Sequence, residues 1–197
     1  MTERGLSGPR LVLTATAGVT LLVAAILSTP HPGESELRVM LRVTALVSAT
    51  FFLAAFTASA WQCLRPTPTT RWMLRNRRYL GLSFAASHFV HGLAILALVH
   101  RLPGGWGAIP LATRAGGGAG YALIAAMAAT SNDRAAAALG RWWYRLHTTG
   151  VYVLWFIFTL TYAGPAARSP FHALLTAAFV AALGLRLWTR FGLNRSP

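Results

Sequence analysis

Residues 75–99 read RNRRYLGLSFAASHFVHGLAILALV, a cluster of arginines followed at once by an apolar run of membrane-spanning length. Two histidines, His88 and His91, lie inside that run. An ionisable side chain within a membrane helix is costly, so its presence indicates a functional site. Neutral imidazole is the commonest metal ligand, and histidine is one of the residues that hold haem iron. The stretch therefore predicts a membrane helix that offers an imidazole to a cofactor.

The composition extends this reading to the whole chain. Of its 197 residues, 55% are hydrophobic and only 11% are charged, whereas about a quarter of the residues of a soluble domain are charged. The net charge of +14 would suit a nucleic-acid partner. However, the arginines stand at the ends of apolar runs, where they meet lipid head groups. We therefore expect an all-α integral membrane protein that binds membrane lipid and no nucleic acid.

Six apolar runs divide the chain and predict a six-helix bundle in one domain, residues 1–197. The fourth run is the weakest because glycine and alanine dominate it, and its start is open between residues 111 and 120. The segments 65–78 and 132–141 are expected to be loops. The expected spans cover residues of about 11–27, 37–64, 79–100, 113–131, 142–162 and 170–188.

The arginines also predict the orientation. Most of them lie at the two termini and in the loops after the second and fourth runs. Cytoplasmic loops carry an excess of basic residues, so both termini are expected in the cytoplasm. The third and fifth spans then run in the same direction across the membrane.

The six histidines fall into two groups. His31, His100 and His172 lie at the ends of spans, where histidines are usually solvated, and we expect little function of them. His88, His91 and His147 lie inside the third and fifth spans. If these helices face each other, His91 and His147 could be the two axial ligands of one haem iron, with His88 as an alternative ligand. The opposing interpretation is that the imidazoles bond to carbonyls or hydroxyls, such as those of Ser87 and Thr148, and only hold the helices together.

Depth in the membrane argues against a simple pairing. His91 lies about 20 Å along its helix from Arg78, but His147 lies only about 3 Å from Arg145. Two ligands of one iron need the same depth. Either the third helix starts well outside the lipid, or the Arg145 side chain extends from within the membrane towards its surface.

Cysteine restricts how a cofactor could be bound. Cys63 stands alone, and the chain has no C-x-x-C-H motif for covalent haem and no thiolate set for zinc or an iron–sulfur cluster. Any haem would therefore be held non-covalently. Gly116–Gly120 follows no strand, so the sequence offers no nucleotide-binding motif.

Two groups of residues resemble a known family. Arg77 to Leu82, with a histidine ten residues after Gly81, is similar to the third helix of the ferric reductase-like transmembrane domain. The closest branch is the haem-binding membrane subunit of the bacterial methionine sulfoxide reductase system. The likeness covers about residues 75–163, and its second part consists of Thr130-Ser131, Leu139-Gly140, Trp142 or Trp143, Arg145-Leu146-His147 and Val151-Tyr152.

The resemblance implies a six-span protein of the bacterial inner membrane that binds haem b. His91 and His147 match the ligand positions of that family. Members of the family often carry a further histidine in the fifth helix, near the position of Leu160, and relatives with two haems carry one in the third helix as well, near the position of Gly104. Because neither region has a histidine here, apart from His100 a turn earlier, we expect a single haem. His88 would be a spare ligand or a partner that tunes the haem.

The predicted function is transfer of single electrons across the membrane, because an iron with two histidine ligands has no open position. We expect the chain to be the electron-transfer subunit of an oxidoreductase, with no catalytic residue of its own assigned. The electron donor would be a quinol or a separate flavoprotein, so this chain could itself bind a quinone or a flavin. The electron acceptor would be an outer-face protein or metal ion.

The alternative is a haem-free membrane scaffold or accessory subunit. A transporter is disfavoured because the four acidic residues, Glu3, Glu34, Glu36 and Asp133, all lie in loops.

Overall fold

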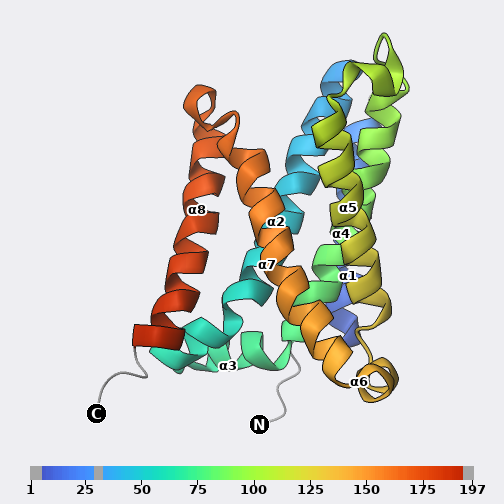
Figure 1. Cartoon of the computed structure of the whole chain (residues 1–197). Helices are drawn as coiled ribbons and strands as arrows, with labels where there is room; N and C mark the ends of the chain where they lie inside the picture. Colours follow the sequence, from blue (N-terminus) through green and yellow to red (C-terminus); the bar gives the residue numbers. More distant parts are fainter. Residues whose placement is uncertain (1–5, 29–32, 193–197) are drawn as a thin grey trace. The chain divides into compact units, whose positions relative to one another are not determined.

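The structure is a computed structural model that describes residues 6–28 and 33–192 (Figure 1). All regular secondary structure in these ranges is helical, as the sequence predicts. The helices are α1 (Pro9–Leu27), α2 (Glu34–Leu64), α3 (Pro68–Arg75), α4 (Arg77–Val99), η1 (Gly105–Ala108), α5 (Leu111–Ala129), α6 (Asp133–Leu139), α7 (Arg141–Ala163), η2 (Ala166–Arg168), α8 (Pro170–Leu187) and the π-helical turn η3 (Trp188–Gly192).

Five of these segments are long and apolar enough to cross a membrane: α1, α2, α4, α7 continued to Arg168, and α8 continued to Gly192. Their outward faces are apolar as well, since Leu21, Leu93 and Leu174 are all more than 60% exposed. A helix that meets water usually places polar side chains there. The length of these helices and their exposed apolar side chains are those of a multi-pass membrane protein.

The fourth expected span corresponds to α5, which begins at Leu111, the early limit of its predicted start. Its 19 residues are long enough to reach across the hydrocarbon core. However, Arg114 and the glycines of 116–118 lower its hydropathy, and it is not among the five apolar segments. The fourth span, and with it the total of six spans, therefore stays a prediction.

Two segments expected to be loops form short helices instead. In α3, the Thr67 hydroxyl accepts from the Thr70 amide at 3.2 Å, and the Thr70 hydroxyl accepts from the Thr67 amide at 2.9 Å. This reciprocal pair resembles a capping box. In α6, the Asn132 side chain accepts from the Ala135 amide at 2.8 Å, which is an ordinary N-cap. The expectation of irregular loops was wrong because it weighed polarity and proline above these capping residues.

The chain divides into two compact units, and each is described by itself. The first comprises Met1–Phe52 and Asn76–Ala115, and the second Leu53–Arg75 and Gly116–Pro197, within the described residues. In the first unit α1 packs along α4 (Figure 1). Its core combines α1, α2 and α4 in one cluster of Leu37, Met40 and Ala94, packed against Val23, Ile26, Leu41 and Leu98.

The starts of α1 and α4 are tied together in this unit. The Gly8 amide donates to the Asn76 side-chain oxygen at 2.9 Å, and Asn76 is buried. Gly8 has a φ of +61°, which glycine adopts without strain. The bond therefore links the residues that precede both helices.

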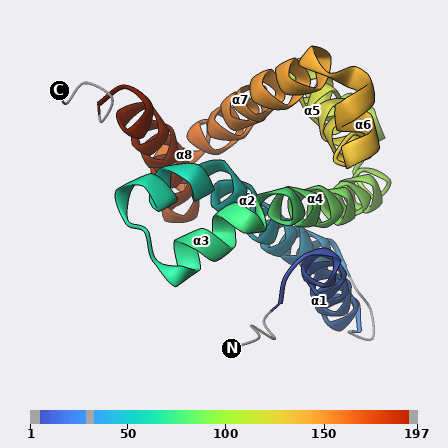
Figure 2. The same ribbon diagram turned by 90° about the horizontal axis from the view of Figure 1, so that it is seen from below.

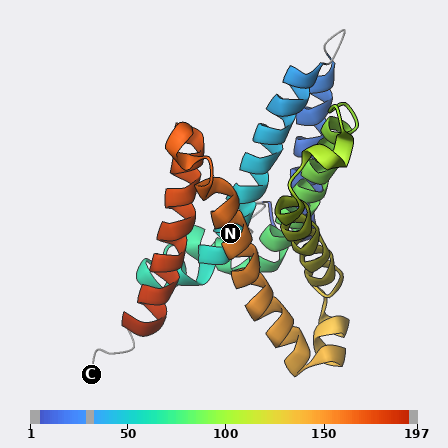
Figure 3. The same ribbon diagram turned by 45° about the horizontal axis from the view of Figure 1, so that its top comes forward.

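In the second unit α7 and α8 form an antiparallel hairpin joined by η2 (Figure 3). The Trp155 indole donates to the Phe179 carbonyl at 2.7 Å. The rings of Phe158 and Tyr162 lie 5.9 and 5.6 Å from that of Phe179. The fully buried Phe179 is therefore the centre of this hairpin.

Helix α5 packs on α7 through a small residue. A Cβ added at Gly150 of α7 would lie 2.6 Å from the Met127 sulfur and 3.3 Å from a Leu123 methyl group. Small residues allow membrane helices this close approach. Helix α3 runs across the direction of α8 in the same unit (Figures 1 and 2), as a helix in the membrane surface would.

Candidate functional site

Helix α4 presents its two histidines as a stacked pair. The rings of His88 and His91 lie 5.3 Å apart, with 28° between their planes. The Phe84 ring follows on the same side, 5.5 Å from that of His88. His88 is buried and His91 half-buried. The pair is thus an ordered feature of the first unit rather than two side chains that face lipid independently.

Helix α2 supplies a hydroxyl for each imidazole. The Thr44 Oγ1 lies 2.9 Å from Nδ1 of His91, and the Ser48 Oγ lies 3.3 Å from Nδ1 of His88. Thr44 and Ser48 are both almost completely buried and stand four residues apart, on one face of the helix. The two pairs form a short polar ladder between α2 and α4, which we call the hydroxyl–imidazole ladder.

One arrangement of the protons in this ladder starts from the Thr44 hydroxyl, which lies 2.7 Å from the Met40 carbonyl. If the hydroxyl donates its single proton there, it accepts from His91. Nδ1 of the neutral His91 imidazole then carries the proton, and Nε2 carries the lone pair.

The same count applies to His88. The Ser48 hydroxyl lies 2.8 Å from the Thr44 carbonyl, and if it donates there it accepts from Nδ1 of His88. Metal-bound histidines usually donate one ring N–H to a carbonyl, carboxylate or water and bind the metal through the other nitrogen. In this arrangement both α4 histidines offer Nε2 to a metal.

His147 has different surroundings in the second unit. Its Nε2 lies 3.0 Å from the Thr130 Oγ1, and its ring stacks on that of Trp143 at 4.3 Å. The Trp143 indole donates to the Thr130 carbonyl at 2.8 Å. Thr130 directly follows α5, so these contacts join the end of α5 to the first turns of α7.

The ring nitrogen of His147 that contacts a hydroxyl is Nε2, not Nδ1 as in the α4 pair. The Thr130 hydroxyl lies 2.7 Å from the Ala126 carbonyl, and if it donates there, Nε2 of the neutral His147 ring carries the proton. The lone pair is then on Nδ1. To bind a metal through Nε2, His147 must first give up its bond to Thr130.

The remaining histidines occupy helix ends. His100 is exposed and caps α4, and Nδ1 of His172 lies 2.9 Å from the Ser169 hydroxyl at the start of α8. His31 lies outside the described residues. Neither His100 nor His172 joins the ladder.

The sequence interpretation missed the partners of the α4 histidines. It named Ser87 and Thr148, but the Ser87 hydroxyl donates to the Phe84 carbonyl of its own helix at 2.9 Å. The signal available was the pair Thr44 and Ser48, two hydroxyls one turn apart within an apolar run. His91 belongs to the first unit and His147 to the second, so their pairing stays a prediction.

No group of three or more His, Cys, Asp or Glu side chains in the described ranges could hold a metal ion. A haem needs only one or two axial ligands from the protein, so this observation does not bear on a haem site.

Comparison of the chain with protein family models finds no match. Comparison with curated proteins and with solved structures also finds none. The function is therefore inferred from the residues and their geometry.

Proposed function

We propose that the chain is a membrane b-type cytochrome that carries single electrons across the bilayer, of the ferric reductase-like kind that its sequence resembles. The observation that supports this most directly is the orientation of His91. Its Nδ1 lies 2.9 Å from the hydroxyl of Thr44, a residue 0% exposed, and a bond donated by Nδ1–H would fix the ring and leave the Nε2 lone pair for iron. His88 would have the same tautomer and would serve as the alternative ligand or as the neighbour that restricts the ring of His91.

The second proposed ligand is His147, and the nitrogen through which it would bind iron depends on its bond to Thr130. Its ring would bind through Nδ1 as it stands, or through Nε2 after the Thr130 bond is exchanged. Either way, the stacked Trp143 ring limits how the imidazole can turn. A haem held by two histidines supplies one-electron transfer and no open coordination site.

The mismatch in depth is eased by the arginines at the start of α7. The guanidinium of Arg145 lies over the Trp142 ring at 5.0 Å, and that of Arg141 lies over the same ring at 5.6 Å. The Arg145 charge is thus directed towards the start of its helix, as an arginine that extends to the membrane surface requires. His147 can then lie deeper than the position of Arg145 alone suggests.

The proposal includes six spans, with α5 as the fourth, and both termini in the cytoplasm of a bacterium. Electrons would come from a quinol or a separate flavoprotein and leave to an acceptor at the outer face. Arg75, Arg77, Arg78 and Arg141 would orient the protein by the positive-inside rule, and their positive charge could attract an acidic donor.

A haem-free scaffold or accessory subunit is the second candidate, and one observation favours it. Each of the three imidazoles already has a hydroxyl partner, and His147 uses the nitrogen that most often binds haem iron. Hydrogen bonds of this kind also stabilise helix association without any cofactor.

An absorption spectrum of the purified protein distinguishes the two. The cytochrome proposal expects a Soret band that is lost or strongly reduced in His91→Ala and His147→Ala and kept in the matched control His172→Ala. The His88→Ala variant separates an alternative ligand, which would lose the band, from a neighbour, which would shift it. A colourless preparation after expression with added haem precursor, from protein that is otherwise folded, would refute the cytochrome and support the scaffold.

A further inference from the structure

A pocket lined mostly by polar side chains lies in the second unit, and it shares no residue with the hydroxyl–imidazole ladder. Its volume is about 270 Å³, and the later half of α2, α7, α8 and the turn η3 contribute its walls. The lining side chains are two arginines, three hydroxyls, a thiol and one alanine, namely Arg186, Arg190, Ser59, Thr189, Tyr152, Cys63 and Ala60.

Arg186 is held in position by aromatic rings. Its guanidinium lies 4.3 Å from the centre of the Phe56 ring and 5.0 Å from that of Tyr152. These two rings meet edge to face at 5.8 Å, and Phe56 is completely buried. Cation–π contacts of this kind hold a guanidinium without neutralising its charge. The pocket therefore has a fixed positive charge in its wall.

Arg190 adds a second charge one helical turn later, and it is exposed. Arginine is suited to phosphate because its planar fork of donors matches two oxygens at once. The hydroxyls of Ser59 and Tyr152 can donate to further oxygens, whereas the Thr189 hydroxyl donates to the Leu185 carbonyl at 3.1 Å. The set of groups therefore matches a phosphate better than a carboxylate, which has fewer oxygens to satisfy.

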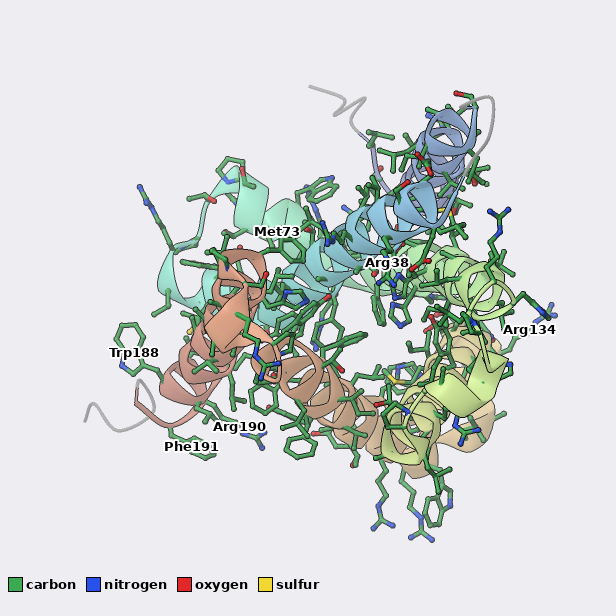
Figure 4. All side chains as sticks on the ribbon, turned by 90° about the horizontal axis from the view of Figure 1, so that it is seen from above. Arg38, Met73, Arg134, Trp188, Arg190 and Phe191 are labelled. Carbon is green, nitrogen blue, oxygen red and sulfur yellow. The ribbon has the colours of Figure 1, made fainter. Side chains whose placement is uncertain are left out.

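The end of α8 has the features of a membrane surface. Trp188 and Phe191 are each 57% exposed, and Figure 4 shows them with Arg190 around this end of the helix. Aromatic and basic side chains gather where the hydrocarbon meets the head groups. The pocket thus lies at the level at which the phosphates of lipids are found.

We propose that this pocket binds a phosphate-bearing anion at the membrane surface, through Arg186 and Arg190. Basic pockets between membrane helices on the cytoplasmic side bind anionic lipid head groups, and a soluble phosphate compound offers the same chemistry. The proposal concerns residues separate from the histidines and holds whether or not the protein carries haem.

The test measures binding to the purified full-length protein in neutral detergent. One arm titrates phosphatidylglycerol and follows bound lipid by native mass spectrometry, and the other titrates glycerol 3-phosphate and inorganic phosphate. Four proteins are compared: the wild type, Arg186→Gln, Arg190→Gln and the control Arg134→Gln, which removes an exposed charge on α6, outside the pocket.

Each pocket variant should weaken phosphatidylglycerol binding about tenfold, since a charge-assisted hydrogen bond is lost, while the control keeps wild-type affinity. Loss of binding in the lipid arm alone assigns the site to a head group, and loss in both arms assigns it to phosphate in general. Equal binding by the wild type and both pocket variants would overturn the proposal. If Arg186→Gln fails to fold, binding by Arg190→Gln and by Tyr152→Phe, which keeps the ring, tests the proposal in the same way.

Discussion

Replacing Thr44 by valine tests the hydroxyl–imidazole ladder directly, because valine keeps the shape of threonine and removes the hydroxyl that His91 contacts. The bond between Thr44 Oγ1 and His91 Nδ1 measures 2.9 Å and is buried. Hydrogen bonds between membrane helices contribute on average about 0.6 kcal/mol and at most about 1.7 kcal/mol. We expect Thr44→Val to lower the free energy of unfolding by about 1–2 kcal/mol.

A double-mutant cycle isolates the contact. In a His91→Leu background the imidazole is absent, so Thr44→Val should cost almost nothing, and the coupling energy should be about 0.6–1.7 kcal/mol. The matched control is Thr50→Val on the same helix, whose hydroxyl donates to the carbonyl of Leu46 in its own helix at 2.9 Å. That variant should change stability by less than about 0.5 kcal/mol.

The assay is reversible unfolding in mixed micelles, with sodium dodecyl sulfate as denaturant and circular dichroism as the signal. A coupling energy near zero would refute the ladder as a stabilising contact. An equal effect of Thr44→Val and Thr50→Val would do the same, because it would reduce the observed loss to a general effect of valine in this helix.

Three further predictions use the same preparation. Ser83→Ala should leave stability unchanged or raise it, because the Ser83 hydroxyl is buried without a hydrogen-bond partner in the described residues, and a drop in the unfolding midpoint would argue against this. Gly150→Val should lower the free energy of unfolding by about 1–3 kcal/mol, because the new side chain would crowd Met127. Gly184→Ala, which has open space around it, should raise the free energy of unfolding by up to about 1 kcal/mol through helix propensity. Equal effects of the two variants would contradict the packing of α5 on α7. If the cytochrome proposal holds, Thr44→Val should weaken haem binding about 10–100-fold in a haem titration followed at the Soret band, and unchanged affinity would show that Thr44 does not orient a ligand.

The sequence by itself determined the helical class and the membrane character of this protein. A run of about 20 apolar residues can satisfy its backbone in lipid only as a helix, so length and hydropathy suffice to locate α1, α2, α4, α7 and α8. The low hydropathy of α5 was also evident from the sequence, because Arg114 and the glycines of 116–118 lie within it. The short helices α3 and α6 were missed because their capping residues also occur in ordinary loops.

Only the tertiary structure decided which polar groups meet. Spacing within α4 indicates that His88 and His91 stand near each other, but it carries no information on the rotation of α2 that brings Thr44 and Ser48 to them. That rotation is set by the packing of Leu37 and Met40 against Ala94, contacts between residues more than fifty positions apart. The tautomer of each imidazole follows from these partners, so it too depends on packing rather than on local sequence. The sequence did not indicate a role for Arg186 for the same reason, since the rings of Phe56 and Tyr152 that hold its guanidinium come from two other helices.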